Sequence, residues 1–212
     1  ELINSSAVKN LANISNTYSV PIIHLSTDYV FDGQKKTAYS ELDLTNPVTV
    51  YGRTKLSGEE HASNAFKFMI IRTSWLYSKF GHNFVKTMLK LGAEKEEISV
   101  VNDQTGSPTN AADLAAAVIH ILQMSIKDEN NFKSGIYHYS NEGSCTWYEF
   151  ASEIMKISNL SCEVHPIGSD QFPSIAKRPK YSLMDKTKIK IAFNLSIPHW
   201  QRSLKKCLSD TN

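Results

Sequence analysis

The stretch at residues 20–28 reads VPIIHLSTD, a short apolar run that ends abruptly in polar residues. Its length and its branched aliphatic side chains are typical of a buried β-strand. Two more apolar runs of strand length follow along the chain, at residues 68–71 and 98–101. Helical spacing or strong helix formers precede each run, at residues 6–15, 46–65 and 83–91.

This alternation of helix and strand predicts a parallel sheet that is covered by helices on both faces. A further helix is expected from Asn110 to Met124, a strand at residues 135–139, and a helix that opens at Thr146 with a capping box. Prolines and short segments dominate the chain after residue 163. We therefore expect an α/β fold, a partial Rossmann-like doubly wound parallel sheet with a smaller C-terminal α+β lobe.

The composition excludes several classes of protein. Of the 212 residues 41% are hydrophobic and 21% are charged, which disfavours a disordered or fibrous chain. A net charge of +2 gives no basic stripe of the kind that nucleic acid requires. The longest mostly apolar stretch, residues 111–124, is too short to span a bilayer. No basic segment followed by an apolar one opens the chain, so we expect a soluble, cytoplasmic protein without nucleic-acid or membrane partners.

The cysteines and histidines give no sign of a metal site. The three cysteines, Cys145, Cys162 and Cys207, are far apart and form no CxxC pair. The seven histidines never occur as HxxxH or HExxH. We therefore expect neither a disulfide framework nor a metal site built by the protein.

Tyr51 and Lys55 lie four residues apart on the expected helix, so their side chains face the same way. An ammonium about 4 Å from a phenol favours the phenolate, by roughly 3 pKa units at an effective dielectric constant near 20. The pair is therefore a candidate for general acid catalysis on a carbonyl oxygen. Taken alone the spacing is weak, since about one such pair arises by chance and a solvated helical face is the alternative.

Polar side chains follow the first two strands. Ser26, Thr27 and Asp28 end the first strand, one loop before the helix of Tyr51. Ligands bind at the carboxyl ends of parallel strands, so these side chains could reach the same carbonyl as Tyr51. Their alternative role is in turns and helix caps. Trp75 follows the second strand, where its indole could pack on a sugar ring or nicotinamide, or simply lie in the core.

These residues carry a resemblance to a known family. The motifs STDYVFDG and VYGRTKLSGE resemble the extended short-chain dehydrogenase/reductases and, within them, the dTDP-4-dehydrorhamnose reductase family. The resemblance continues, in the family's order, in RTSWLY, NFV, VNDQTGSPT, GIYH and RPKYSLMD. It covers nearly the whole chain, which makes it far more specific than the Tyr–Lys spacing.

The resemblance implies a role for each matching residue. Tyr51 would be the general acid and Lys55 its partner, which also holds the nicotinamide ribose. Thr27 would bond the substrate carbonyl or tune Tyr51, and the backbone near Leu25 would line the nicotinamide. The implied cofactor is NADPH or NADH, and the implied reaction is reduction of the C4 ketone of dTDP-4-dehydro-L-rhamnose to dTDP-L-rhamnose.

The resemblance also implies contacts to the dTDP-sugar. Asp28 and Trp75 would touch the sugar, while Gln104 and Arg178 are candidates for the nucleotide diphosphate. A surface salt bridge is the alternative for Arg178. Magnesium is associated with some relatives, but no carboxylate cluster suggests where it would bind. The catalytic part of the cofactor-binding domain is assigned to residues 1–109 and a mainly substrate-binding, interleaved lobe to residues 110–212. A homodimer is kept open.

The sequence departs from the family in its glycines. No two of the nine glycines are spaced as GxGxxG or GxxGxxG, the turn that lets a backbone approach a pyrophosphate. We therefore expect a part of a longer reductase that binds the cofactor weakly on its own. Two alternatives stay open: another nucleotide-sugar epimerase or dehydratase with the same Tyr–Lys pair, and a non-catalytic regulatory subunit of the same fold.

Overall fold

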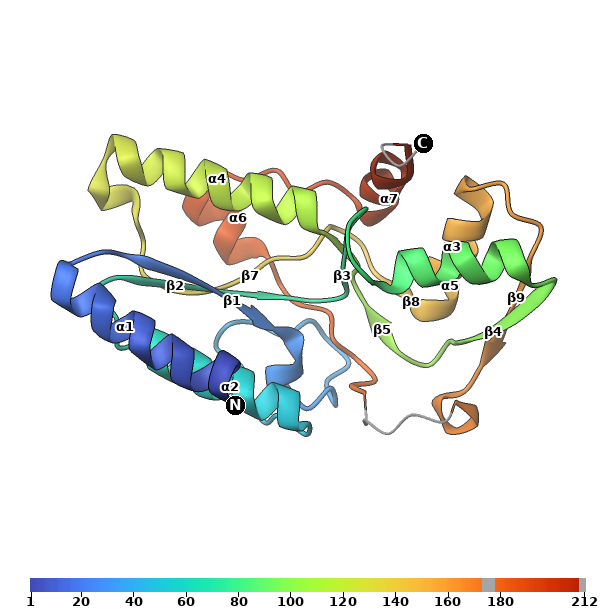
Figure 1. The fold of residues 1–212 in the computed structure, drawn as a ribbon, viewed down its shortest axis with the longest axis horizontal. Helices are drawn as coiled ribbons and strands as arrows, with labels where there is room; N and C mark the ends of the chain where they lie inside the picture. Colours follow the sequence, from blue (N-terminus) through green and yellow to red (C-terminus); the bar gives the residue numbers. More distant parts are fainter. Residues whose placement is uncertain (173–177, 210–212) are drawn as a thin grey trace.

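The structure is a computed structural model that describes residues 1–172 and 178–209. Its centre is a parallel three-stranded sheet in the order β1 (Ile22–Thr27), β2 (Phe68–Thr73) and β7 (Gly135–His138). The helices α1 (Ala7–Tyr18) and α2 (Val50–Ala62) cover one face of this sheet, and α4 (Ala111–Lys127) and α6 (Thr187–Phe193) cover the other (Figure 1). The predicted α/β class with helices on both faces is confirmed.

Side chains alternate along β2, which explains why both faces need a cover. Met69 and Ile71 pack with Leu114 and Ile121 of α4. Ile70, between them, packs on the opposite face with α1 and α2. All three β2 side chains are at most 1% exposed. An apolar run without polar alternation is what a strand buried on both faces requires.

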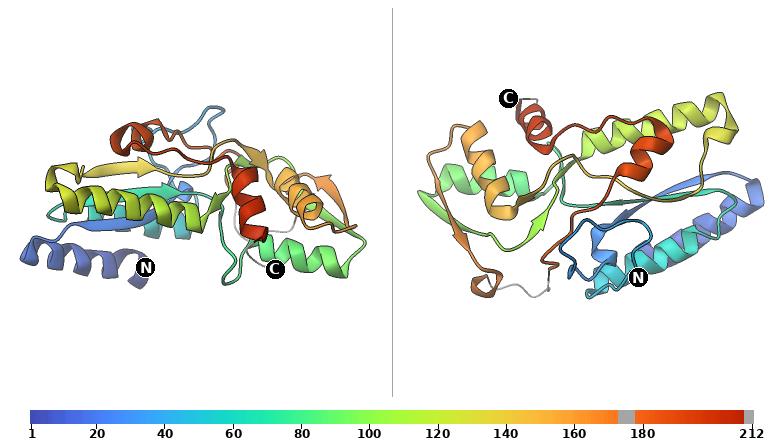
Figure 2. Two further views of the ribbon diagram at one scale, coloured as in Figure 1. Left: turned by 90° about the horizontal axis from the view of Figure 1, so that it is seen from above. Right: turned by 180° about the vertical axis from the view of Figure 1, so that it is seen from behind.

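A second lobe lies beside the sheet (Figures 1 and 2). Its core joins α3 (Phe84–Glu94), α5 (Trp147–Ile157) and α7 (Trp200–Ser209) to a parallel pair of strands, β4 (Glu97–Val101) and β9 (Glu163–Ile167). The shorter elements are listed here by their bounds: η1 (Leu2–Ser6), η2 (Asp28–Val30), β3 (Leu76–Tyr77), β5 (Thr105–Gly106), β6 (Thr109–Asn110), η3 (Glu129–Asn131), β8 (Cys145–Thr146) and η4 (Ser169–Gln171).

The strand at residues 98–101 is the main correction to the predicted fold. It was expected in the sheet of the first two strands, but it forms β4 and pairs with β9 in the second lobe, while β7 takes the place next to β2. The physical reason is visible in its burial. Glu97 and Ser99 are exposed and Ile98 and Val100 are buried, so the face of β4 that also carries the buried Val101 is partly solvated, unlike either face of the central β2.

The two lobes are interleaved along the chain. The helix α3 and the strand β4 precede residue 110 and build the second lobe, whereas α4 and β7 follow it and complete the first. The functional division between residues 1–109 and 110–212 stays a prediction. Among the residues that the structure describes, no helix is both long and apolar enough to cross a membrane.

Asn141, which is fully buried, links the two lobes through its side chain. Its Oδ1 accepts from the backbone N–H of Asn110 at 2.7 Å, and its Nδ2 donates to Asp113 at 2.8 Å and to Ser203 of α7 at 3.0 Å. The first two partners belong to the β6–α4 junction. A buried amide with partners in both lobes fixes their relative placement.

Asn141→Ala is expected to lower the free energy of unfolding by about 2–3 kcal/mol, because it leaves a buried N–H and a carboxylate without this partner. Urea denaturation would measure the change. The control is Asn13→Ala, at an exposed position of α1, which should change the stability by no more than about 0.5 kcal/mol. Equal effects of the two substitutions would contradict the linking role of Asn141.

Candidate active site

Polar residues gather at the carboxyl end of β1. Ser26, Thr27 and Asp28 are 4%, 5% and 3% exposed. The hydroxyl of Thr27 caps the short helix η2, because it accepts from the backbone N–H of Tyr29 at 3.2 Å, and it donates to Oδ1 of Asp28 at 3.0 Å. The capping role that was the alternative for this stretch is therefore real for Thr27. It does not compete with a role in a site, since the same hydroxyl also contacts Tyr51.

Tyr51 lies in the first turn of α2, directly beside this strand end. Thr49 caps the helix by accepting from the backbone N–H of Gly52 at 3.0 Å, so α2 begins later than the expected Asn46. The phenol of Tyr51 has the Thr27 hydroxyl as a hydrogen-bonding neighbour, and its ring is 49% exposed. The structure thus brings Tyr51 and Thr27 together, as predicted from the sequence.

Lys55 follows one helical turn later and reaches β1. Its Nζ donates to the backbone oxygen of Leu25 at 2.6 Å. The Leu25 side chain is 44% exposed. The five predicted residues Leu25, Thr27, Asp28, Tyr51 and Lys55 therefore lie at one end of β1 and along the helix face beside it.

The expected acidification of Tyr51 is not what the structure gives. Burial raises the pKa of Tyr51, the Thr27 hydroxyl lowers it and the charge of Asp28 raises it again, with a net rise above the ordinary value. Lys55 is drawn to the Leu25 oxygen, and burial lowers the pKa of its own ammonium. The rise comes from burial and the neighbouring carboxyl, and Lys55 is not among the groups that lower the pKa of Tyr51, which corrects the prediction. A raised pKa keeps Tyr51 protonated near neutral pH, as a proton donor must be.

Asp28 has an unusual environment. Burial raises the pKa of its carboxyl to about 7, although hydrogen bonds from Thr27 and Ser182 oppose this rise. Its Oδ2 is buried and has no hydrogen-bond partner among the residues that the structure describes. An unsatisfied buried polar atom is costly and is common where a ligand completes the hydrogen bonding. The Oδ2 atom is therefore a candidate acceptor for a ligand hydroxyl.

Trp75 lies in a left-handed backbone conformation, with φ at +47°, which is rare for a bulky residue. Its indole stacks on Trp147 of α5 with ring centroids 3.6 Å apart and an angle of 9° between the planes. The other neighbour is Gly106, where an added Cβ would lie 2.6 Å from Trp75. The half-buried indole packs at the edge of the second core, which was one of the two alternatives, and its contact with a sugar ring or nicotinamide stays a prediction.

A cavity of about 760 Å³ lies in the second lobe, next to this stack. Gln104 and Arg178 both line it, as does Trp147. Its other lining residues include the aromatic Phe84 and Phe172 and the cationic Lys180. Gln104 is 7% exposed and donates to the Ser169 hydroxyl at 2.8 Å. The two residues predicted for the nucleotide side thus share one cavity.

The cavity and the strand edge are connected. The Ser182 hydroxyl bonds Asp28 and lies 2.7 Å from the position of a Cβ on Gly106, whose other neighbour is Trp75. Arg178 acts electrostatically on Tyr29, whose ring meets that of Tyr51 edge-on at 5.8 Å. A chain of contacts therefore leads from Asp28 through Ser182 and Gly106 to Trp75, which stacks on Trp147 of the cavity, while the charge of Arg178 acts on the ring beside Tyr51.

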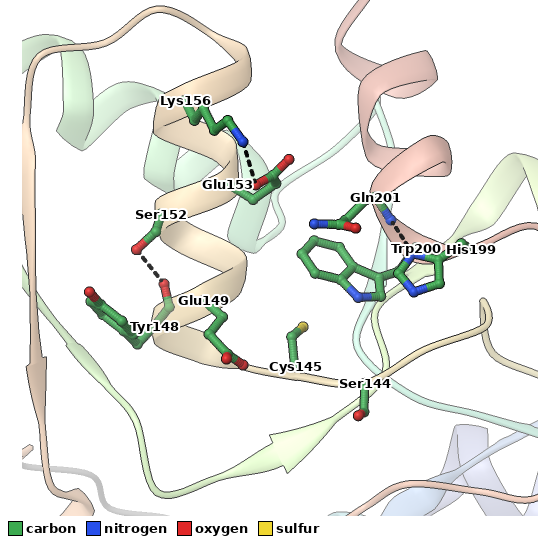
Figure 3. Close-up of a pocket in the computed structure, with 10 residues that line it drawn as sticks. All are labelled: Ser144, Cys145, Tyr148, Glu149, Ser152, Glu153, Lys156, His199, Trp200 and Gln201. Carbon is green, nitrogen blue, oxygen red and sulfur yellow. Dashed lines mark hydrogen bonds and ion pairs between the residues drawn. The ribbon is translucent and has the colours of Figure 1, made fainter.

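A second cavity, of about 440 Å³, lies between α5 and α7 and includes Cys145, Glu149 and His199 (Figure 3). None of the site residues predicted from the sequence lines it. Burial raises the pKa of the Cys145 thiol, so its reactive thiolate form is disfavoured. Among the described residues no group of three or more His, Cys, Asp or Glu side chains could hold a metal ion.

Sequence reasoning missed two contributors. Ser182 holds Asp28, but a lone serine in a loop gives no signal in a single sequence. Glu59 is buried against Arg72 of β2 with an Nη2–Oε2 distance of 2.7 Å. Its signal was available, since Tyr51, Lys55 and Glu59 are spaced four apart and so share a helix face.

Known proteins resemble the entire chain. The family model described as RmlD substrate binding domain matches residues 1–212. A dTDP-4-dehydrorhamnose reductase of Sinorhizobium fredii is 39% identical over 209 residues, which are 96% of this chain and 71% of the relative. The Escherichia coli K12 enzyme of that name is 36% identical over 99% of this chain and 72% of its own length.

Solved structures agree. A dTDP-4-dehydrorhamnose reductase of Bacillus anthracis in complex with NADP has a TM-score of 0.91 at 39% identity, with 98% of this chain and 72% of that chain covered. A dTDP-glucose 4,6-dehydratase of the same species with NAD has a TM-score of 0.79 at 16% identity, covers 97% of this chain and 66% of that one, and shows the shared fold alone. The chain belongs to the dTDP-4-dehydrorhamnose reductase family of the extended short-chain dehydrogenase/reductases.

Proposed function

We propose that this chain carries the catalytic residues of an oxidoreductase that uses NADPH or NADH to reduce the C4 ketone of dTDP-4-dehydro-L-rhamnose to dTDP-L-rhamnose. The observation that carries the proposal is the convergence of Tyr51, Thr27 and Lys55 at the end of β1, beside Asp28. Family membership supports the substrate and the reductase activity. The NADP complex of the Bacillus anthracis relative supports the cofactor.

The donor set at β1 fits a nicotinamide nucleotide. The Lys55 ammonium has three donors, of which the Leu25 oxygen accepts one, so others can bind ribose hydroxyls. The exposed Leu25 side chain offers an apolar contact to a flat ring. The bound cofactor supplies a hydride for the C4 carbon of the sugar. Leu25, Tyr51 and Lys55 are the residues of this chain that would hold it.

The proton comes from Tyr51. Its phenol donates to the C4 oxygen, and the Thr27 hydroxyl beside it helps to place that oxygen. The tyrosinate that remains is stabilised by the Thr27 hydroxyl, which lowers the pKa of Tyr51. Asp28 accepts a sugar hydroxyl at Oδ2.

The dTDP part occupies the cavity of the second lobe. Arg178 and Lys180 place two cations beside the aromatic side chains Phe84 and Trp147, which is the chemistry that a base and a diphosphate need. Gln104 supplies a buried amide. Trp75, which stacks on Trp147, lies between this cavity and the sugar at Asp28. A homodimer and a cytoplasmic location stay predictions.

The full natural protein, mixed with NADPH and dTDP-4-dehydro-L-rhamnose, is expected to oxidise NADPH and to yield dTDP-L-rhamnose, identified by mass spectrometry and NMR. NADPH oxidation without this product would contradict the proposal. Conversion of a nucleotide sugar without net oxidation of the cofactor would instead favour an epimerase or a dehydratase. Binding without any conversion would favour the non-catalytic alternative.

Gly106→Ala is expected to raise KM for the dTDP-sugar several-fold, with a smaller change in kcat, because the added methyl would overlap both Trp75 and Ser182. Steady-state kinetics over a range of sugar concentrations measure the split. The control is Gly81→Ala, whose added carbon meets no described atom within 4 Å, so that it carries only the backbone strain of its left-handed conformation (φ +64°) and should leave KM unchanged. A Gly106→Ala enzyme with an unchanged KM would contradict the proposed placement of the sugar.

A further inference from the structure

Glu59 is a buried carboxylate on the catalytic helix α2, and the proposed reaction gives it no role. It is 3% exposed. Its Oε1 accepts from Nε of Arg72 at 3.0 Å, and its Oε2 from Nη2 at 2.7 Å. The hydroxyl of Ser26 also donates to Oε1. One carboxylate on α2 thus receives donors from both β1 and β2.

A gain in folding stability alone does not explain the buried ion pair of Glu59 and Arg72. Removing two charges from water costs several kcal/mol per ion, and an apolar pair of similar volume often serves the fold as well. Arg72 also lies over the ring of Phe31 at 5.0 Å, and its Nη1 has no partner among the described residues. The ion pair is therefore better explained by what it does to its neighbours.

Those neighbours are the catalytic groups. Ser26 directly precedes Thr27, and Leu25 directly precedes Ser26 and accepts from Lys55. Lys55 lies one helical turn before Glu59. The contacts of Glu59 and Lys55 therefore fasten α2 to two consecutive residues of β1, Ser26 and Leu25, directly before Thr27, whose hydroxyl neighbours the Tyr51 phenol.

The charge of Glu59 also favours the ammonium form of Lys55. Burial lowers the pKa of Lys55, and the anion of Glu59 raises it. His24 of β1 also faces these groups, but burial and Lys55 lower its pKa to about 4, so it is neutral near pH 7. Arg72 faces Glu59 from β2, and Asp28 faces the Tyr51 end of the helix. From η1, Asn4 and Ser5 bring only neutral side chains to Thr54 and Ser57 of α2.

We propose that Glu59 is a positioning residue of this active site: held by Arg72 and Ser26, its carboxylate fixes α2 against β1 and keeps Lys55 as an ammonium on the Leu25 oxygen. The inference rests on the proposed function for its catalytic consequence. The effects of Glu59 on the stability of the fold and on the titration of Lys55 can be measured without turnover. A purely structural ion pair would stabilise the fold but would leave the titration of Lys55 unchanged.

The test is Glu59→Gln in the full natural protein labelled with ¹³C at the lysine ε-carbons, with the Lys55 signal assigned by its loss in Lys55→Arg. The titration of Lys55 is expected to move by about one pH unit toward neutrality. The alkaline limb of the kcat profile should move with it, so kcat near pH 9 falls by about tenfold more than near pH 7. An unmoved Lys55 titration would overturn the proposal.

Glu59→Gln leaves Arg72 as a buried charge without its partner, which can prevent folding. The double variant Glu59→Gln/Arg72→Gln removes both charges, and the same shift of Lys55 is expected because its pKa responds to burial and to Glu59. Glu142→Gln is the matched control, since Glu142 accepts at 2.7 Å from Lys190 of α6, the helix on the opposite face of the sheet from α2. It should lower Tm and leave Lys55 unmoved.

Two outcomes separate this inference from the proposed function. If the natural protein does not reduce the sugar, the proposed function fails, and the ¹³C titration still decides whether Glu59 holds the charge of Lys55. If it reduces the sugar and Glu59→Gln changes Tm alone, the proposed function stands and Glu59 is only structural.

Discussion

Tyr51→Phe is expected to lower kcat by about 10²–10⁴-fold with little change in KM for the sugar. Removing the phenolic oxygen takes away the proton that the C4 oxygen receives, and general acid catalysis contributes an effect of this size. The ring itself remains to pack beside Tyr29, so the fold and the sugar contacts should persist. A loss in kcat without a rise in KM is what a group that acts only in the transition state gives.

The measurement is NADPH oxidation under saturating substrate, with Tm as a check on folding. Tyr29→Phe is the matched control, because Tyr29 is the neighbouring phenol and the Thr27 hydroxyl acts on Tyr51. It should change kcat by less than about threefold. Undiminished turnover by Tyr51→Phe would remove the catalytic assignment, and equal losses in the two variants would show that the ring pair matters rather than one proton.

The pH dependence of this reaction is open to the same test. Burial and the charge of Asp28 both raise the pKa of Tyr51, so the phenol stays protonated across neutral pH. The activity should therefore fall on the alkaline side as Tyr51 or Lys55 loses its proton. Tyr51→Phe should lose the part of that dependence that comes from the phenol, and any alkaline fall that remains in its residual activity comes from Lys55.

The alternation of helices and strands was enough to predict the fold class, because strands buried on both faces read as apolar runs. It was not enough to place residues 98–101. A strand's partner depends on contacts distant in sequence, here with Glu163–Ile167, and no local pattern in β4 states which strand it meets. For the same reason, the local sequence did not predict that residues 135–138 form the strand next to β2.

The sequence predicted which residues of the site are neighbours, but its prediction that Lys55 lowers the pKa of Tyr51 was wrong. A four-residue spacing on a helix and a polar strand end are local features, and they did bring Tyr51 and Thr27 together. The pKa of Tyr51 depends instead on how far the ring is buried and on Asp28, which only the folded structure gives. Gln104 and Arg178 were predicted from the family resemblance, and the structure places both in the lining of one cavity.

The difference in stability between Asp28→Asn and the natural protein is expected to shift in favour of the variant as the pH rises. Burial raises the pKa of Asp28 to about 7 from an ordinary value of 3.8. Because the folded form binds its proton more tightly than the unfolded form, the resulting stabilisation is complete below about pH 4 and is lost as the pH rises to about 7. A difference of this size corresponds to about 4 kcal/mol across that interval.

Asparagine has no proton to lose, so the variant lacks this dependence. The free energy of unfolding of the variant minus that of the natural protein should therefore rise by about 4 kcal/mol between about pH 4 and pH 8. Urea denaturation at several pH values measures the difference. The control is Asp43→Asn, since the Lys35 ammonium lowers the pKa of Asp43 to about 2 and the sign of its pH dependence is opposite.

Asp28→Asn should impair the reaction, although it removes the loss of stability that accompanies ionisation of Asp28. The Oδ2 atom of Asp28 accepts a sugar hydroxyl in the proposed complex, and an amide nitrogen at that position would donate instead. We expect KM for the dTDP-sugar to rise by about tenfold, the loss of one hydrogen bond to a charged group. The Asp28 carboxyl weakens the fold at neutral pH but strengthens substrate binding. Its role in binding therefore explains why a carboxyl is buried at this position. A variant that binds the sugar normally and gains no stability at alkaline pH would refute both parts of this account.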